Sequence, residues 1–144
     1  MCNFNITSSK IRPSNSIKRM DDQEGILQLN KIFKEISEKR SLSMTFELYM
    51  AGDINDAKRF LVKTASIQGN CWSIEPTEYI YSGGREQGFI VRYINYPKHP
   101  KTYSELEEEC KNLAIHLMTE LGQGSCSIVG PEETIFLTRR PKDE

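Results

Sequence analysis

Hydrophobic residues recur with two different periods along the chain, and this divides it into expected helices and strands. Between residues 22 and 39 they recur every three or four positions, as on one face of a helix: Ile26, Leu29, Ile32, Phe33 and Ile36. Acidic residues precede this stripe, whereas Lys39 and Arg40 follow it, which matches the helix dipole. The pattern predicts an amphipathic helix within residues 21–40.

From residue 43 onward the period becomes two, which is typical of strands. Over 44–50 the apolar residues Phe46, Leu48 and Met50 alternate with polar ones. The same reasoning predicts strands at 71–81, 89–96, 125–129 and 134–139. Pro76 interrupts the strand at 71–81, which favours a bulge or a place at a sheet edge. The glycines from Gly83 to Gly88 are expected to form the turn that follows it.

Two further helices are predicted from their capping residues. Asp53 follows Gly52 and can cap a helix over 54–65. Thr102 and Glu105 have the spacing of a capping box, and Gly122 is a natural end for the helix that they begin.

The resulting order of elements, βαββαβ with one added strand, predicts an α+β protein with a ferredoxin-like plait. In this fold an antiparallel sheet carries both helices on one face, and the strands 44–50 and 89–96 lie at its centre. We expect four regions: a flexible basic arm at 1–20, the amphipathic helix at 21–40, the plait at 43–139 with a C-terminal hairpin, and a charged tail at 140–144.

The orientation of the sheet follows from Arg92. A guanidinium buried under helices would be costly, so its strand neighbours Phe89, Val91 and Tyr93 should face the core. The opposite face then carries an expected binding surface around a Glu47–Arg92 cross-strand pair, with Phe136 as a further member. The residues of this surface are Tyr49, Ile90, Arg92 and Ile94. Because a large exposed apolar area is unfavourable on a monomer, we expect this face to be covered by the N-terminal helix of the same chain or by another molecule.

Composition excludes several classes of protein. The chain has 144 residues and a net charge of −1, and it contains no apolar run near the ~20 residues of a membrane span. The charge disfavours a dedicated duplex-DNA binder, although the basic arm leaves contacts to nucleic acid phosphates as an alternative. Because the N-terminus lacks the apolar stretch of a signal peptide, a cytoplasmic location is expected.

Residues with catalytic chemistry are scattered. The four cysteines have no metal-binding spacing, and neither histidine is accompanied by a motif that suggests a triad. The glycine-rich segment 82–88 joins two expected strands rather than a strand and a helix, so it is interpreted as a turn and not as a phosphate loop. We therefore expect no cofactor, no metal and no catalytic residue.

One segment is similar to a known family. The stretch from Phe46 to Arg59, with Gly52 and Asp53 between its strand and its helix, resembles the opening of the small plait nucleases of CRISPR adaptation. The resemblance covers ten to fifteen residues. It implies that Asp53 helps to bind a metal ion in a dimer. A helix cap is the alternative role for this residue.

The interpretation that we favour is a small, non-enzymatic protein-interaction module that acts as a homodimer or binds another protein. An antitoxin, an immunity protein or a phage-encoded accessory factor would have this size, although this is an analogy of scale. Two alternatives stay open. One is a dimeric metal-dependent nuclease that uses Asp53, and the other is a nucleic-acid binder that uses the basic arm. No contact with a membrane is expected.

Overall fold

The computed structural model describes residues 22–68 and 71–143, so the expected basic arm lies outside the described residues. The described chain forms two units, one containing helix α1 (Asp22–Glu35) and the other beginning at Leu42. Within the described ranges, no helix is long and apolar enough to cross a membrane.

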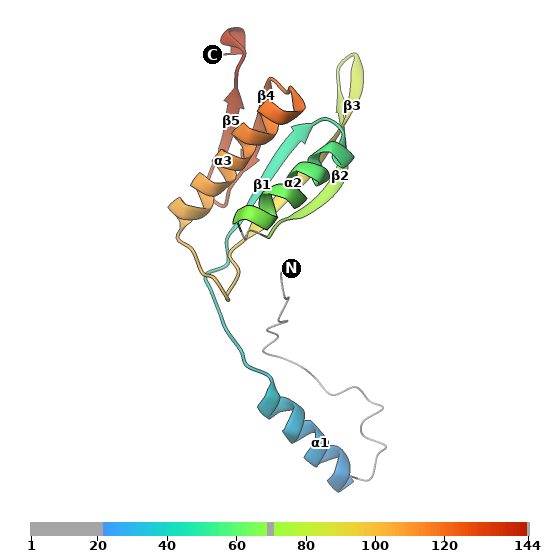
Figure 1. Ribbon diagram of the computed structural model, residues 1–144, viewed down its shortest axis with the longest axis vertical. Coiled ribbons are helices and arrows are strands. Elements are labelled where there is room, and N and C mark those ends of the chain that lie inside the picture. Colours follow the sequence, from blue (N-terminus) through green and yellow to red (C-terminus); the bar gives the residue numbers. More distant parts are fainter. Residues whose placement is uncertain (1–21, 69–70, 144) are drawn as a thin grey trace. The chain divides into compact units, whose positions relative to one another are not determined.

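The second unit is built on one antiparallel sheet of five strands in the order β2-β3-β1-β4-β5. Both of its α-helices pack on the same face of this sheet (Figure 1). This arrangement confirms the expected ferredoxin-like plait with a C-terminal hairpin. The elements are β1 (Thr45–Ala51), α2 (Ile54–Gln68), β2 (Ser73–Tyr81), β3 (Gly84–Ile94), α3 (Tyr103–Leu121), β4 (Ser125–Val129), β5 (Thr134–Thr138) and a final 3-10 turn, Pro141–Asp143.

The two strands expected at the centre, β1 and β3, are neighbours. Leu48 lies opposite Val91 and Met50 lies opposite Phe89, and all four side chains are 0–1% exposed. Phe46 and Tyr93 form the next pair on the same face, also buried. The orientation deduced from Arg92 is therefore confirmed.

Helix α3 supplies much of the core against this sheet. Its buried residues share one face: Leu106, Cys110, Leu113, Ala114, Leu117 and Met118. Burial raises the pKa of the Cys110 thiol to about 12 and that of Cys126 on β4 to about 11, so both stay protonated at neutral pH. These two cysteines are core residues.

The caps of α3 are those expected. The Thr102 hydroxyl accepts a hydrogen bond from the Glu105 amide at 3.2 Å, and Gly122 has a left-handed φ of 67°. A Cβ at position 122 would be strained by this φ, which is why a glycine ends the helix.

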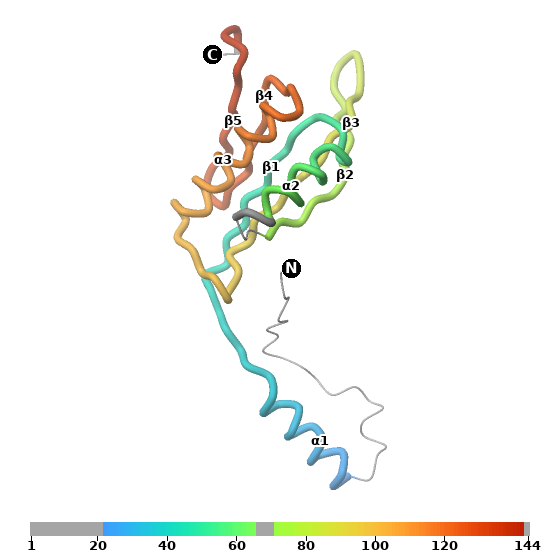
Figure 2. The backbone as a smooth tube through the Cα atoms, in the orientation of Figure 1, coloured from blue at the N-terminus to red at the C-terminus, as the bar shows by residue number. Residues whose placement is uncertain are grey.

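The hairpin between β2 and β3 differs from the expected one. The turn is only Ser82–Gly83, and Gly83 has the positive φ of 92° that a tight turn requires. Strand β3 therefore begins at Gly84 instead of Phe89. Because β1 pairs with β3 only as far as Gly88, the hairpin continues beyond β1 as a two-stranded ribbon (Figure 2).

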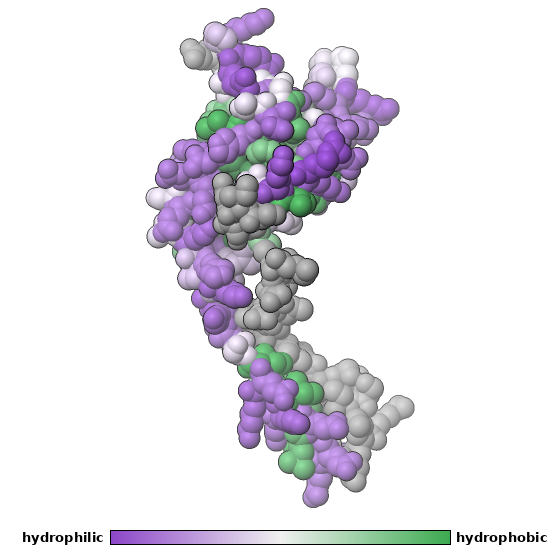
Figure 3. All heavy atoms as spheres, in the orientation of Figure 1, coloured by the Kyte–Doolittle hydropathy of each residue, from purple (hydrophilic) through white to green (hydrophobic). Residues whose placement is uncertain are grey.

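Helix α1 is described by itself. It ends at Glu35, four residues before the expected end near Lys39. Apolar and hydrophilic side chains both lie on its surface in Figure 3, and Ile26, Ile32 and Phe33 are 44–56% exposed. That α1 covers the sheet of its own chain, or packs on a partner, stays a prediction.

Candidate functional site

The face of the sheet opposite α2 and α3 holds the candidate site, and we call it the open face. Successive side chains of a strand point to opposite faces, so the residues between the core positions of β1 and β3 lie on the open face. All four predicted surface residues belong to it: Tyr49, Ile90, Arg92 and Ile94. Phe136 of β5 lies on it too, since Tyr49, Ser127 and Phe136 are successive partners across β1, β4 and β5.

A network of charged side chains occupies the middle of the open face. The Arg92 Nε–H donates to Glu47 Oε2 at 3.2 Å, and its Nη2–H donates to Glu75 Oε1 at 2.6 Å. The Tyr49 hydroxyl also donates to Glu47 Oε2, at 3.1 Å. We call these four residues the Arg92 network. It confirms the expected Glu47–Arg92 pair and adds Glu75.

The electrostatics of the network reflect these hydrogen bonds. The bond from Arg92 holds the pKa of the Glu75 carboxyl below its usual value, and the same bond raises the pKa of the Arg92 guanidinium. Desolvation, followed by the bond to Glu47, raises the pKa of the Tyr49 phenol. Two carboxylates lie beside one guanidinium, so the formal net charge of the network is −1.

The apolar residues of the open face are unequally accessible. Ile94 is 42% exposed and Phe136 is 55% exposed, whereas Ile90 is only 7% exposed between its strand partners Tyr49 and Glu75. Of the predicted surface residues, Ile90 therefore offers the least contact area, and the accessible middle of the face is polar.

Tyr79 and Gly88 form a second feature of the open face that sequence reasoning missed. The Tyr79 hydroxyl lies 3.4 Å from the carbonyl oxygens of Met50 and Phe89. Its ring leaves no room at Gly88, where a Cβ would lie 2.4 Å from Tyr79 Cε2. Burial raises the pKa of the Tyr79 phenol to about 12. Tyr79 lies two positions along β2 from Thr77, the strand partner of Gly88, so the contact could be found only once the register of β2 was known.

Asp53, the residue singled out by the nuclease resemblance, caps α2. Its Oδ1 accepts hydrogen bonds from the amides of Asn55 at 2.7 Å and Asp56 at 3.3 Å. Over the described ranges, no group of three or more His, Cys, Asp or Glu side chains is placed to hold a metal ion. The metal-binding role of Asp53 stays a prediction.

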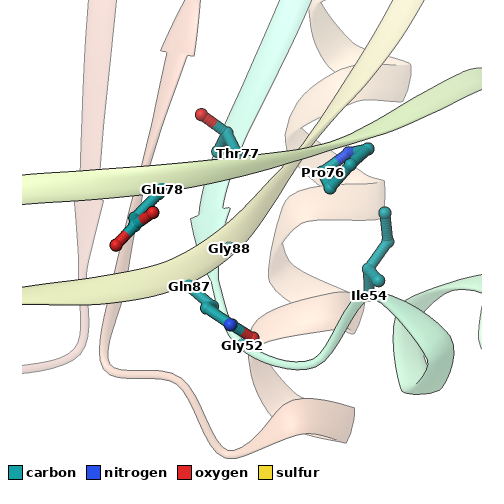
Figure 4. A pocket seen from close by; sticks show the side chains of 7 residues that line it. All are labelled: Gly52, Ile54, Pro76, Thr77, Glu78, Gln87 and Gly88. Atoms are coloured by element: carbon teal, nitrogen blue, oxygen red, sulfur yellow. The ribbon is translucent and has the colours of Figure 1, made fainter.

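A hollow of about 340 Å³ lies where β2 and β3 pass the start of α2 (Figure 4). Its lining residues come from these three segments: Gly52, Ile54, Pro76, Thr77, Glu78, Gln87 and Gly88. Glu78 is the one ionisable side chain among them, and it forms an ion pair with Arg85 at 3.2 Å. The hollow therefore presents fewer charged side chains to a ligand than the Arg92 network does.

Comparison with known proteins adds a structural likeness. No family model and no curated protein matches the chain. A phage SAM lyase solved in its apo state is similar over 67% of this chain and 90% of its own, with a TM-score of 0.59 and 12% identity. A phage SAM lyase solved in complex with S-methyl-5'-thioadenosine is similar over 72% and 95%, with the same score and identity. At 12% identity, this likeness shows a shared fold and nothing further.

Proposed function

We propose that the protein binds S-adenosylmethionine (SAM) on its open face and acts on it as a lyase. The observation that carries the proposal is the Arg92 network, in which two carboxylates share one guanidinium. SAM has a sulfonium, an ammonium and a carboxylate at neutral pH, so its net charge of +1 complements the net charge of −1 of the network.

Two aromatic residues, one in the network and one outside it, support the same ligand. Tyr49 and Phe136 flank Ser127 on the open face, and Phe136 is 55% exposed. An aromatic ring attracts a cation through its face and can also stack on a purine, and SAM contains both groups. The likeness over 90% and 95% of the chains in two solved structures of phage SAM lyase supports the reaction class.

The proposal predicts that the full-length protein converts SAM to S-methyl-5'-thioadenosine. In that cleavage a carboxylate oxygen of the same SAM molecule bonds to the methionine Cγ while the bond between Cγ and the sulfonium sulfur breaks. The electron pair of the broken bond stays on sulfur, and the amino-acid end leaves as its lactone. Liquid chromatography with mass spectrometry measures both compounds directly. Glu47→Gln should raise the KM for SAM by about tenfold, because it removes one charge from the network. Glu78→Gln, which alters an exposed ion pair outside the open face, is the control.

Two results would contradict this function. One is a wild-type protein that neither binds nor consumes SAM. The other is an equal rise in KM for the Glu47 and Glu78 variants, because the open face would then have no special part in binding.

The second candidate is the protein-interaction module expected from the sequence, with a second copy of this chain as its partner. The observation that favours it is the exposure of Ile94 and Phe136 on the open face. Sedimentation equilibrium of the full chain should then give the mass of two chains. A mass of one chain at all concentrations tested would contradict the dimer and leave SAM binding unaffected.

A further inference from the structure

We propose that Arg92 and Glu75 form a subsite for the zwitterionic amino-acid end of the ligand. The inference rests on the proposed function, because it divides the open face between the two ends of SAM. It assigns the carboxylate of the ligand to Arg92 and its ammonium to Glu75.

The donors come from the guanidinium of Arg92. A guanidinium has five N–H groups, and in the described part of the chain two of those of Arg92 are paired, one through Nε and one through Nη2. The side chain is 33% exposed, so the remaining N–H groups, including both on Nη1, are available to a carboxylate from solution. Arginine suits this role because its planar N–H groups match the two oxygens of a carboxylate.

The acceptors lie beside these donors. Glu75 uses Oε1 for Arg92, and its side chain is 47% exposed, so the carboxylate can accept a further hydrogen bond from an ammonium. The 2.6 Å bond fixes the distance between the positive and the negative group. An α-amino acid has a carboxylate and an ammonium on the same carbon, and it can therefore contact both groups at once.

The neighbouring residues favour this location over the rest of the open face. Glu47 has two hydrogen-bond donors on one oxygen and is only 27% exposed, so it is less accessible than Glu75. The aromatic residues Tyr49 and Phe136 lie on β1 and β5, whereas Glu75 lies on β2, which is separated from β1 by β3. The amino-acid end and the nucleoside end of one ligand can thus occupy different strands.

Isothermal titration calorimetry of the full chain with three probes tests the subsite. The probes are SAM, S-methyl-5'-thioadenosine, which lacks the amino-acid end, and L-methionine, which lacks the nucleoside. Arg92→Gln should weaken SAM binding at least tenfold and change the affinity for S-methyl-5'-thioadenosine by less than about twofold. Arg85→Gln removes a more exposed ion pair that lies off the open face, and it should change neither affinity. Circular dichroism melting confirms that each variant is folded.

The outcomes separate the subsite from the proposed function. Equal affinities of the wild type for SAM and S-methyl-5'-thioadenosine, or an Arg92→Gln variant that loses both equally, would overturn the subsite while SAM binding stands. If L-methionine were the one probe of the three that binds, and Arg92→Gln abolished this binding, the subsite would be supported and the proposed function overturned. A wild type that binds none of the three probes would overturn both.

Discussion

Gly88→Ala is expected to destabilise the protein by about 3 kcal/mol, a large part of the stability of a domain of this size. A Cβ at this position would lie 2.4 Å from the Met50 carbonyl oxygen and 2.4 Å from Tyr79 Cε2. The carbonyl oxygen belongs to the central strand β1 and cannot move without breaking the pairing of β1 with β3. The Tyr79 ring would also have to leave the open face.

Urea unfolding followed by circular dichroism measures this change, and the matched control is Gly84→Ala in the same strand. There the nearest atoms belong to the exposed Tyr81 side chain, 3.3 Å away, which can rotate aside. The control should stay within about 0.5 kcal/mol of the wild type. Equal midpoints for the two variants would show that the tight contact at Gly88 does not exist in solution.

The fold was predictable because its signals are local and strong. Alternating apolar residues identify β1, and the Thr102 and Gly122 caps delimit α3 within a residue. The orientation of the sheet needed a single side chain, since Arg92 could not be placed under the helices without a large desolvation cost. The Glu47–Arg92 pair then followed from the antiparallel pairing of two strands that the sequence identifies clearly.

The remainder of the candidate site depends on the register of β2, which has no clear local signal. Pro76 confirms the expected sheet edge, because β2 is an edge strand and continues through this residue, whose missing N–H is not needed there. This position does not fix the register. Only the pairing of Glu75 with Ile90 brings that carboxylate to Arg92. The extra length of the hairpin could not be seen for the same reason, because three glycines between residues 83 and 88 suggest a longer turn than Ser82–Gly83.

The fold alone does not define the function of this protein. A ferredoxin-like plait is used by proteins with many activities, so the likeness to SAM lyases gains weight only from the chemistry of the open face. The excess carboxylate and the exposed aromatic ring on that face suit a cationic nucleoside. The same polar centre is a weaker basis for a dimer, since stable dimer interfaces are depleted of charge at their cores.

If the open face binds SAM as we propose, Arg92→Glu should weaken that binding more than Arg92→Gln does, and it should also lower the Tm at neutral pH by several degrees. It would place three carboxylates where the wild type has two carboxylates and a guanidinium. The affinity should fall further than in Arg92→Gln, because the group that binds the ligand carboxylate is replaced by one that repels it. If the open face is a dimer interface instead, the same variant should sediment as a single chain.

The pH dependence of this difference in Tm distinguishes the loss of the Arg92 ion pairs from general misfolding. In the wild type the pKa of Glu75 is lowered, so its contribution to stability is present above the usual glutamate pKa of about 4.3 and is lost as the pH falls through the folded value. In Arg92→Glu the crowded carboxylates should have raised pKa values. Their protonation then favours the folded state at low pH, and this contribution is lost as the pH rises through those values. The difference in Tm between wild type and variant should therefore be largest near neutral pH and shrink as the pH approaches about 4.

Arg92→Gln, which adds no carboxylate, is the control and should show a smaller pH dependence. A Tm difference that is constant over this range would show that the three positions do not interact as the structure places them.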